Sequence, residues 1–198
     1  MPEACLDACK AAHEKGITVS CDLNYRGKLW SREKAGEVMS QLMPYVDICI
    51  ANEEDAKDVF GIAAENTDIN TGKLNQEGYV SVARQLTERF NFRTVAITLR
   101  GSISASENNW SGMLYVDGKA HFARNYLIKL VDRVGGGDSF GGGLIHAMRK
   151  WPGNPQQQIE FAVAASCLKQ ATEFDFNLAS EQEVLALVGG NASGRVQR

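Results

Sequence analysis

Residues 131–143 read Val131-Asp132-Arg133-Val134-Gly135-Gly136-Gly137-Asp138-Ser139-Phe140-Gly141-Gly142-Gly143, and this stretch decides the fold. An extended segment, His121 to Leu130, leads into the first three glycines. From Asp138 onward apolar residues recur at helical spacing, which predicts a helix over 138–150. Glycines before a helix start leave backbone N–H groups uncovered. Together with the positive end of the helix dipole, those groups form an anion site.

Asp138 stands at the predicted helix start, where a lone carboxylate would simply cap the helix. A carboxylate beside an anion site is also what phosphoryl transfer to an alcohol requires. The carboxylate takes the hydroxyl proton while backbone amides hold the transferring phosphoryl oxygens. A cap does not need six glycines within nine residues, each of which weakens a helix or strand interior. The glycines therefore favour a phosphate-directed site.

Two other phosphate-binding motifs are excluded. No register of residues 131–143 gives the dinucleotide fingerprint G-x-G-x-x-G, and Asp138 would face the pyrophosphate in that reading. The P-loop motif G-x-x-x-x-G-K-[ST] occurs nowhere in the chain.

Composition indicates one α/β domain with a substantial core. The chain has 198 residues, of which 44% are hydrophobic and 23% charged. A net charge of −3 favours neither nucleic acid nor an anionic membrane as a partner. Without an apolar run of about 20 residues or a signal peptide, we expect a cytoplasmic protein. Five cysteines without a C-x-x-C pair predict reduced thiols rather than a metal site.

The first half alternates strands and helices. Apolar β-rich runs predict strands over Ile17–Leu23, Val46–Ala51 and Arg93–Leu99, the first of them well buried. Helical patterns are predicted before the first strand, over 3–15, and between the strands, over 31–43, 55–60 and 77–90, with a surface loop over 61–76. Strands connected by helices predict a mostly parallel sheet covered on both faces.

The pattern changes after residue 112. Two extended runs flank Asp117-Gly118, which is a strong hairpin signal. Three helices are predicted to close the chain, over 138–150, 156–172 and 180–188. Residues 189–198 read as a disordered tail, so residues 1–188 are expected to form the domain.

The stretch ending in Asp138 resembles the second signature of the ribokinase-like (PfkB-type) carbohydrate kinases, D-T-x-G-A-G-D. The resemblance implies a three-layer α/β/α fold, with Asp138 as the catalytic base and Gly135, Gly136 and Gly137 as the anion hole. Arg133-Val134 replaces the usual threonines. Because that segment helps to form the monovalent-cation site of some relatives, such a site is not expected here.

Asn52-Glu53-Glu54-Asp55 places three carboxylates at a predicted helix start. They would interact favourably with the helix dipole, or they would hold Mg²⁺ through water. The cluster resembles the family's N-x-x-E motif, with Asp55 where Glu is usual. We therefore expect Mg²⁺ near Asn52, Glu53, Glu54 and Asp55, and which carboxylate serves it stays open.

Asp22-Leu-Asn-Tyr-Arg26 resembles the D-L-N-Y-R segment of 2-keto-3-deoxygluconate kinases. Three other segments resemble the corresponding parts of the same kinases: residues 102–112, 131–133 and 174–178. An arginine on a loop at a strand end suits bidentate binding of a carboxylate or phosphate. By resemblance Arg26 contacts the acid sugar or the transferring phosphate, and Asn24 lies nearby. Sugar binding is thus expected at Arg26, Asn24 and Asp138.

On the nucleotide side, Thr98, Arg100 and Gly101 correspond to the loop beneath ATP in the family, and they are expected to bind ATP with Gly135 and Gly137. A plain strand exit is the alternative for this segment. Relatives often carry Asn for the adenine pocket where Val163 stands here, which implies apolar contacts to adenine.

Family members carry a long N-terminal lid half that has no counterpart in this chain. The resemblance implies an ATP- and Mg²⁺-dependent kinase of 2-keto-3-deoxygluconate. The alternatives are a nucleotide-binding module without turnover, or a kinase of a neutral ketose or nucleoside. The partners expected are small molecules, not nucleic acid or membrane. An exposed sheet edge beside strand 17–23 is expected to drive association into a homo-oligomer or aggregate.

Overall fold

The structure is a computed structural model that describes residues 2–52, 54–63, 76–104 and 106–190. The chain divides into two compact units, the first from residues 1–99 and 113–120 and the second from residues 100–112 and 121–198. The expectation that residues 1–188 form one domain stays a prediction. Parts of the predicted 61–76 loop and of the tail lie outside the described residues.

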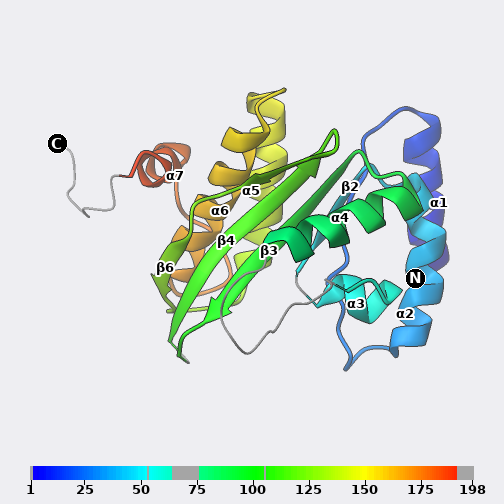
Figure 1. Cartoon of the computed structure of the whole chain (residues 1–198), viewed down its shortest axis with the longest axis horizontal. Coiled ribbons are helices and arrows are strands. Elements are labelled where there is room, and N and C mark those ends of the chain that lie inside the picture. Colours follow the sequence, from blue (N-terminus) through cyan, green and yellow to red (C-terminus); the bar gives the residue numbers. More distant parts are fainter. Residues whose placement is uncertain (1, 53, 64–75, 105, 191–198) are drawn as a thin grey trace. The chain divides into compact units, whose positions relative to one another are not determined.

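The first unit alternates strands and helices as expected (Figure 1). Strand β3 continues from it into the second unit. In chain order its elements are α1 (Pro2–Glu14), β1 (Ser20–Asp22), α2 (Arg32–Leu42), the 3-10 helix η1 (Met43–Tyr45), β2 (Ile48–Ala51), α3 (Asp55–Phe60), α4 (Gln76–Phe90) and β3 (Thr94–Ser102).

The remaining strands and three helices follow. Strands β4 (Glu107–Val116) and β5 (Lys119–Phe122) pass through both units, and the second unit continues with β6 (Tyr126–Lys129), α5 (Gly136–Lys150), α6 (Pro155–Gln170) and α7 (Glu181–Val188). The three predicted closing helices are confirmed. Within the described residues, no helix is long and apolar enough to cross a membrane.

The sheet is mixed, with strand order β1-β2-β3-β4-β5 and with β6 paired to β4. Strand β2 lies parallel to both β1 and β3, with Cys49 opposite Cys21 and Val95. Strand β6 runs antiparallel to β4. The predicted hairpin is confirmed at Asp117-Gly118, where both residues have positive φ (50° and 73°) as a two-residue turn requires.

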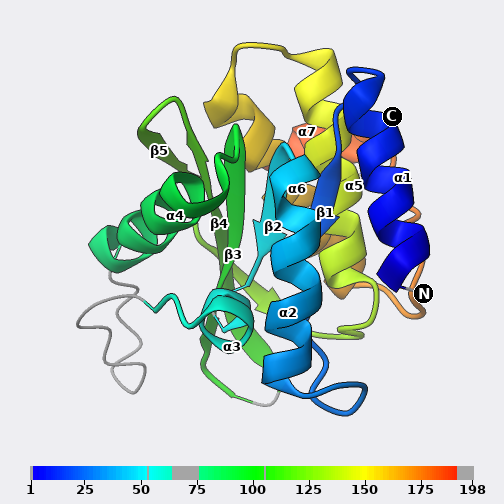
Figure 2. The same cartoon turned by 90° about the vertical axis from the view of Figure 1, so that its right-hand side faces the viewer.

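The prediction of a well-buried strand over residues 17–23 is wrong. Strand β1 is only three residues long with alternating exposure, and Ile17 is 56% exposed. Its residues meet one neighbouring strand, β2, so little covers them. The backbone of Val19 is instead held by Asp47, whose carboxylate accepts the Val19 N–H at 2.8 Å. Helices α1 and α2 lie side by side next to this strand (Figure 2).

Helix α2 starts where the sequence predicts, because Ser31 caps it by accepting the N–H of Lys34 at 3.3 Å. Helix α7 has a complete capping box, in which Ser180 and Glu183 each accept the other's backbone N–H. Helix α1 buries none of its residues, so its apolar side has no core to cover within the described chain.

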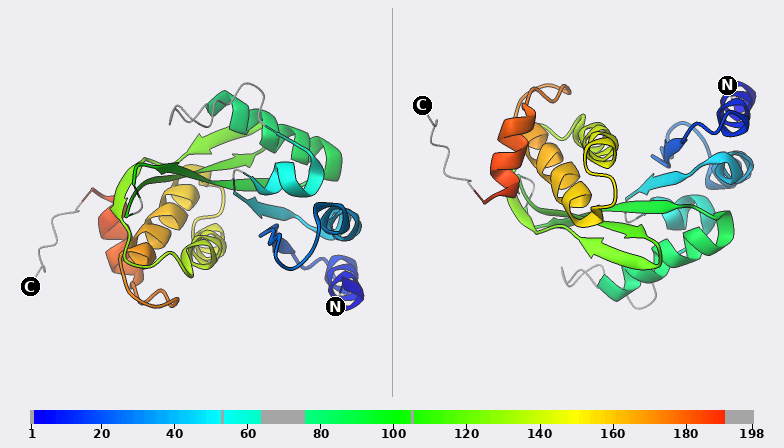
Figure 3. Two further views of the ribbon diagram at one scale, coloured as in Figure 1. Left: turned by 90° about the horizontal axis from the view of Figure 1, so that it is seen from below. Right: turned by 90° about the horizontal axis from the view of Figure 1, so that it is seen from above.

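In the second unit α5 and α6 lie against each other along their length (Figure 3). Their approach is close, because a Cβ on Gly143 would lie 3.1 Å from the Ala165 Cβ and 3.3 Å from the Ala162 Cα. Helix α7 adds Val184 to a buried cluster that includes Phe161. This packing fixes the first turn of α5, where the glycine stretch ends.

Candidate active site

The glycine stretch forms the turn into α5, as predicted, but the helix begins two residues earlier than expected. Gly135 is the N-cap residue, with φ of 78° and no side-chain cap. Asp138 is therefore the third residue of the helix and does not cap it. The capping explanation of this carboxylate loses its main support.

Three backbone N–H groups at this helix start are uncommitted. The N–H of Gly136 donates to the Arg133 carbonyl at 3.2 Å, so it is held inside the turn. For the N–H groups of Gly135, Gly137 and Asp138, no acceptor lies among the residues that the structure describes. Orphan N–H groups at a helix start are anion-binding groups. The sequence predicted an anion hole at Gly135, Gly136 and Gly137 and did not indicate the Asp138 amide.

The Asp138 side chain is exposed, and its carboxylate has no hydrogen-bond or ion-pair partner within residues 2–52, 54–63, 76–104 and 106–190. Nothing covers Gly137, because a Cβ there would meet no atom within 4 Å. A free carboxylate and free amides thus occur together on one helical turn, open to a ligand.

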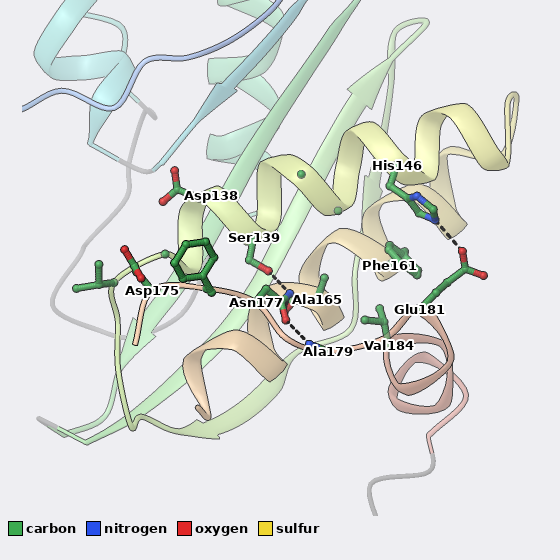
Figure 4. A pocket seen from close by; sticks show the side chains of 15 residues that line it. Asp138, Ser139, His146, Phe161, Ala165, Asp175, Asn177, Ala179, Glu181 and Val184 are labelled. Atoms are coloured by element: carbon green, nitrogen blue, oxygen red, sulfur yellow. Dashed lines mark hydrogen bonds and ion pairs between the residues drawn. The ribbon is translucent and has the colours of Figure 1, made fainter. Parts of the chain in front are cut away.

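A cavity of about 640 Å³ extends from this turn along α5. Figure 4 shows Asp138 and His146 from the same helix at opposite ends of it. Eight residues of helix separate them by about 12 Å. Phe161, Ala165 and Val184 supply apolar walls from α6 and α7. An elongated cavity with anion-binding groups at one end and apolar walls at the other suits a phosphorylated aromatic ligand.

At the far end lie contacts to Glu181 that the sequence did not reveal. His146 Nε2 lies 2.9 Å from Glu181 Oε2, and Lys150 pairs with the other oxygen of the same carboxylate. The hydrogen bond from Lys150 and then that from His146 hold the pKa of Glu181 below its usual value. The His146 ring also lies 5.3 Å from that of Phe161.

Asn177 joins the loop before α7 to both long helices. Its Nδ2 donates to Ser139 Oγ at 2.6 Å and to the Ala165 carbonyl at 3.1 Å, and its Oδ1 accepts the Ala179 N–H at 2.9 Å (Figure 4). The apolar contacts to adenine expected at Val163 stay a prediction. This residue is fully buried against β4, where a Cβ on Gly112 would lie 2.9 Å from it, and it does not line the cavity.

In the first unit, the turns after β1 and β2 meet at Asp55. Its Oδ1 accepts the N–H of Tyr25 at 3.1 Å and its Oδ2 accepts the N–H of Asn52 at 3.1 Å. Asp55 is 3% exposed, and burial raises its pKa although these hydrogen bonds oppose the rise. Asn24, with φ of 37°, and the exposed Arg26 lie on the turn that this carboxylate fixes.

Asp55 therefore anchors two loops, and the predicted Mg²⁺ site near it stays a prediction. Asn52 Oδ1 accepts the N–H groups of Glu54 and Asp55 at 2.8 and 3.0 Å, while the Glu54 side chain is exposed. Glu53 lies outside the described residues. Among the residues described, no group of three or more His, Cys, Asp or Glu side chains is placed to hold a metal.

The predicted nucleotide-side residues lie on β3. Thr98 belongs to the first unit, and Arg100 and Gly101 belong to the second. Gly101 is close to β4, where its Cβ would lie 3.3 Å from that of Asn109. None of the three lines the cavity beside α5. The structure thus groups Asn24, Arg26, Asn52, Glu54 and Asp55 in one unit and Gly135, Gly136, Gly137 and Asp138 in the other.

The chain is similar in fold and sequence to known carbohydrate kinases. A 2-dehydro-3-deoxygluconokinase from Thermotoga maritima superposes with a TM-score of 0.88 and 49% identity, over 96% of this chain and 55% of that one. A PfkB family carbohydrate kinase from Listeria grayi superposes with a TM-score of 0.81 and is 32% identical, over 95% of this chain and 55% of that one. The 2-dehydro-3-deoxygalactonokinase of Haloferax volcanii is 27% identical over 93% of this chain and 51% of its own length.

The chain thus spans about half the length of these relatives. The similarity to the Thermotoga enzyme confirms the expected three-layer α/β fold. Residues 1–173 match the pfkB family carbohydrate kinases as a group. The chain belongs to the pfkB family of carbohydrate kinases.

Proposed function

We propose that this chain carries the catalytic base and the nucleotide side of an ATP-dependent kinase whose substrate is 2-keto-3-deoxygluconate. The observation that carries the proposal is the first turn of α5. There a free carboxylate, Asp138, accompanies free backbone amides at the end of a 640 Å³ cavity. Family membership supports the reaction class.

In the proposed reaction Asp138 accepts the proton of a sugar hydroxyl while the oxygen of that hydroxyl forms a bond to the γ-phosphorus of ATP. The bond from that phosphorus to the bridging oxygen breaks, and ADP leaves. The N–H groups of Gly135, Gly137 and Asp138 stabilise the charge on the phosphoryl oxygens during the transfer. Mg²⁺ would neutralise phosphate charge, and Asn52, Glu53, Glu54 and Asp55 are the residues proposed to hold it through water.

The nucleoside of ATP is assigned to the α5–α6–α7 cavity, with phosphates toward Gly137 and the base toward Phe161 and His146. Thr98, Arg100 and Gly101 remain proposed as further nucleotide contacts. The sugar is assigned to the turn that carries Asn24 and Arg26, because the guanidinium of Arg26 is exposed and matches a carboxylate. The name of the Thermotoga relative supports a keto-deoxy sugar acid.

The second candidate is a nucleotide-binding module without turnover. The observation that favours it is the exposure of both predicted sugar contacts, Asn24 and Arg26, within the described residues. Water around these groups weakens the electrostatic contacts on which transfer depends. Association of chains through the exposed β1 edge is proposed as well.

A coupled ADP-release assay separates these functions. ADP release that requires the sugar acid would support the kinase function. ATP binding without such release would support the nucleotide-binding module. The substrate is defined by comparing ADP release with 2-keto-3-deoxygluconate, with 2-keto-3-deoxygalactonate, with fructose and with a nucleoside. Activity confined to the neutral compounds would contradict the assignment of Arg26.

A further inference from the structure

The last turn of α6 holds the segment that leads into the free amides. The carbonyl of Gln170 accepts the N–H groups of Val131 and Asp132 at 2.9 and 3.3 Å. Four residues earlier, Ser166 Oγ donates to the Gly136 carbonyl at 2.8 Å, and Gln170 Nε2 lies 3.3 Å from the same hydroxyl. Both ends of the glycine turn are thus fixed to one helix terminus.

Lys169, in the same turn of α6, is a buried charge that the proposed reaction does not use. Its side chain is 0% exposed. Its ammonium lies 3.5 Å from two backbone carbonyl oxygens, those of Asp132 and Thr172. In the part of the chain that the structure describes, no carboxylate pairs with it. A buried ammonium needs compensation, and here the backbone carbonyls of Asp132 and Thr172, just outside α6, are the acceptors within reach.

The contact with Lys169 adds a second backbone hydrogen bond to Asp132. The N–H of Asp132 is held by Gln170, its carbonyl by Lys169, and its Oδ1 accepts the N–H of Val134 at 2.9 Å. A residue whose N–H, carbonyl and side chain are all hydrogen-bonded cannot reorient without breaking several of these bonds. Its orientation determines how the chain enters the positive-φ turn at Gly135.

We propose that Lys169 is a positioning residue for phosphoryl transfer. Its ammonium acts as a cation built into the chain, joining the Asp132 and Thr172 carbonyls and thereby holding the N–H groups of Gly137 and Asp138 in place for phosphate. This inference rests on the proposed function for its catalytic meaning. The contact itself is independent of that function, so the two are tested separately.

The first test measures amide hydrogen exchange in peptides covering 131–137. Lys169→Met keeps the apolar stem and removes the charge and donors. We expect exchange in this segment to rise at least about tenfold, equivalent to about 1.4 kcal/mol of local stability. Lys129→Met, which replaces an exposed lysine of β6, is the matched control and should leave exchange unchanged. Unchanged exchange at 131–137 in folded Lys169→Met would overturn the proposal.

If Lys169→Met does not fold, the wild-type protein still decides. A buried, hydrogen-bonded ammonium should give slowly exchanging Nζ protons in ¹⁵N spectra, with cross-peaks to residues 132 and 172. An Nζ signal that exchanges as fast as those of exposed lysines would count against the contact.

The second test measures ATP·Mg affinity by calorimetry in wild type and Lys169→Ala. We expect affinity to fall about tenfold and to recover partly with methylammonium, which supplies both charge and N–H donors. Tetramethylammonium has the charge without donors and should not restore it. Absent recovery, or equal recovery with both ions, would reduce Lys169 to a packing residue. Failure of the wild type to bind ATP would contradict the proposed function instead, and the exchange result would still stand.

Discussion

The backbone carbonyl of Asp175 occupies the space in which a side chain on Gly135 would have to lie. An ideal Cβ at Gly135 would overlap that oxygen, and the residue has φ of 78°. Two independent constraints therefore require glycine at the start of α5. One is local backbone conformation, and the other is the approach of a loop forty residues further along the chain.

Gly135→Ala should consequently lower the free energy of unfolding by about 2–4 kcal/mol, since positive φ and steric overlap each cost about 1–2 kcal/mol. Gly142→Ala is the matched control, because a Cβ there meets nothing within 4 Å. That change should raise stability by up to about 1 kcal/mol. Urea unfolding of both variants measures the difference, and equal stabilities would contradict the overlap.

Asp138→Asn should lower kcat by at least about 10², the usual size of a lost general base, while ATP affinity stays nearly constant. The measurement is sugar-dependent ADP release in a form of the protein that turns over sugar. Asp175→Asn, on the neighbouring loop of the same cavity, is the control and should retain most activity. Turnover of Asp138→Asn within threefold of wild type would show that Asp138 serves the helix rather than the reaction.

Arg26→Met should lower kcat/KM for the acid sugar, because the substrate anion loses a charged partner. The loss of transition-state stabilisation should be about 2–4 kcal/mol. The turn itself should persist, since Arg26 contributes to it through its carbonyl, which accepts the N–H of Leu29 at 2.8 Å. Lys28→Met tests general charge loss on the same exposed loop. An unaltered kcat/KM in Arg26→Met would remove this residue from the sugar site.

Asp55→Asn should destabilise the protein by about 1–3 kcal/mol, because an amide NH₂ would face one of the two N–H groups that the carboxylate accepts. The effect should depend on pH. Burial raises the pKa of Asp55 from 3.8, so its protonated form contributes stability below that value, and this is lost as pH rises through the folded pKa.

The gap in stability between wild type and Asp55→Asn should therefore narrow as pH rises from about 4 toward neutrality. Urea unfolding at several pH values measures it. Glu54→Gln, an exposed neighbour, should show no comparable gap. A gap that widens with pH would mean that the folded state favours the ionised form.

Ile17→Lys should reduce association of the chain, if chains associate through the β1 edge. Ile17 is 56% exposed just before that strand, and lysine near an edge opposes pairing with another chain. Sedimentation velocity should show larger species in wild type and smaller ones in the variant. Leu178→Lys controls for general apolar exposure, since Leu178 is 84% exposed elsewhere. A monomeric wild type would remove the β1 edge from consideration.

The glycine turn, the hairpin and the helix caps could be predicted because their requirements are local. Positive φ at Gly135 and at Asp117-Gly118, and the Ser31 cap, each depend on residues within a few positions. The burial of β1 could not be predicted, because an apolar run does not reveal how many strands will flank it.

Contacts across the sequence were invisible for a related reason. His146 and Glu181 are 35 residues apart, and Lys169 and Asp132 are 37 apart. No spacing rule connects such pairs, which meet only once α5, α6 and α7 have packed. The cavity beside α5 was therefore not predicted from the sequence.

The two hydrogen bonds accepted by Asp55 couple the loop after β1 to the loop after β2. Tyr25 donates from one loop and Asn52 from the other, so a displacement of the shared carboxylate would affect both loops. A ligand that orders the Asn24–Arg26 turn would thus lower the entropic cost of binding a cation beside Asn52. Binding linkage then requires the cation to increase affinity for that ligand by the same factor.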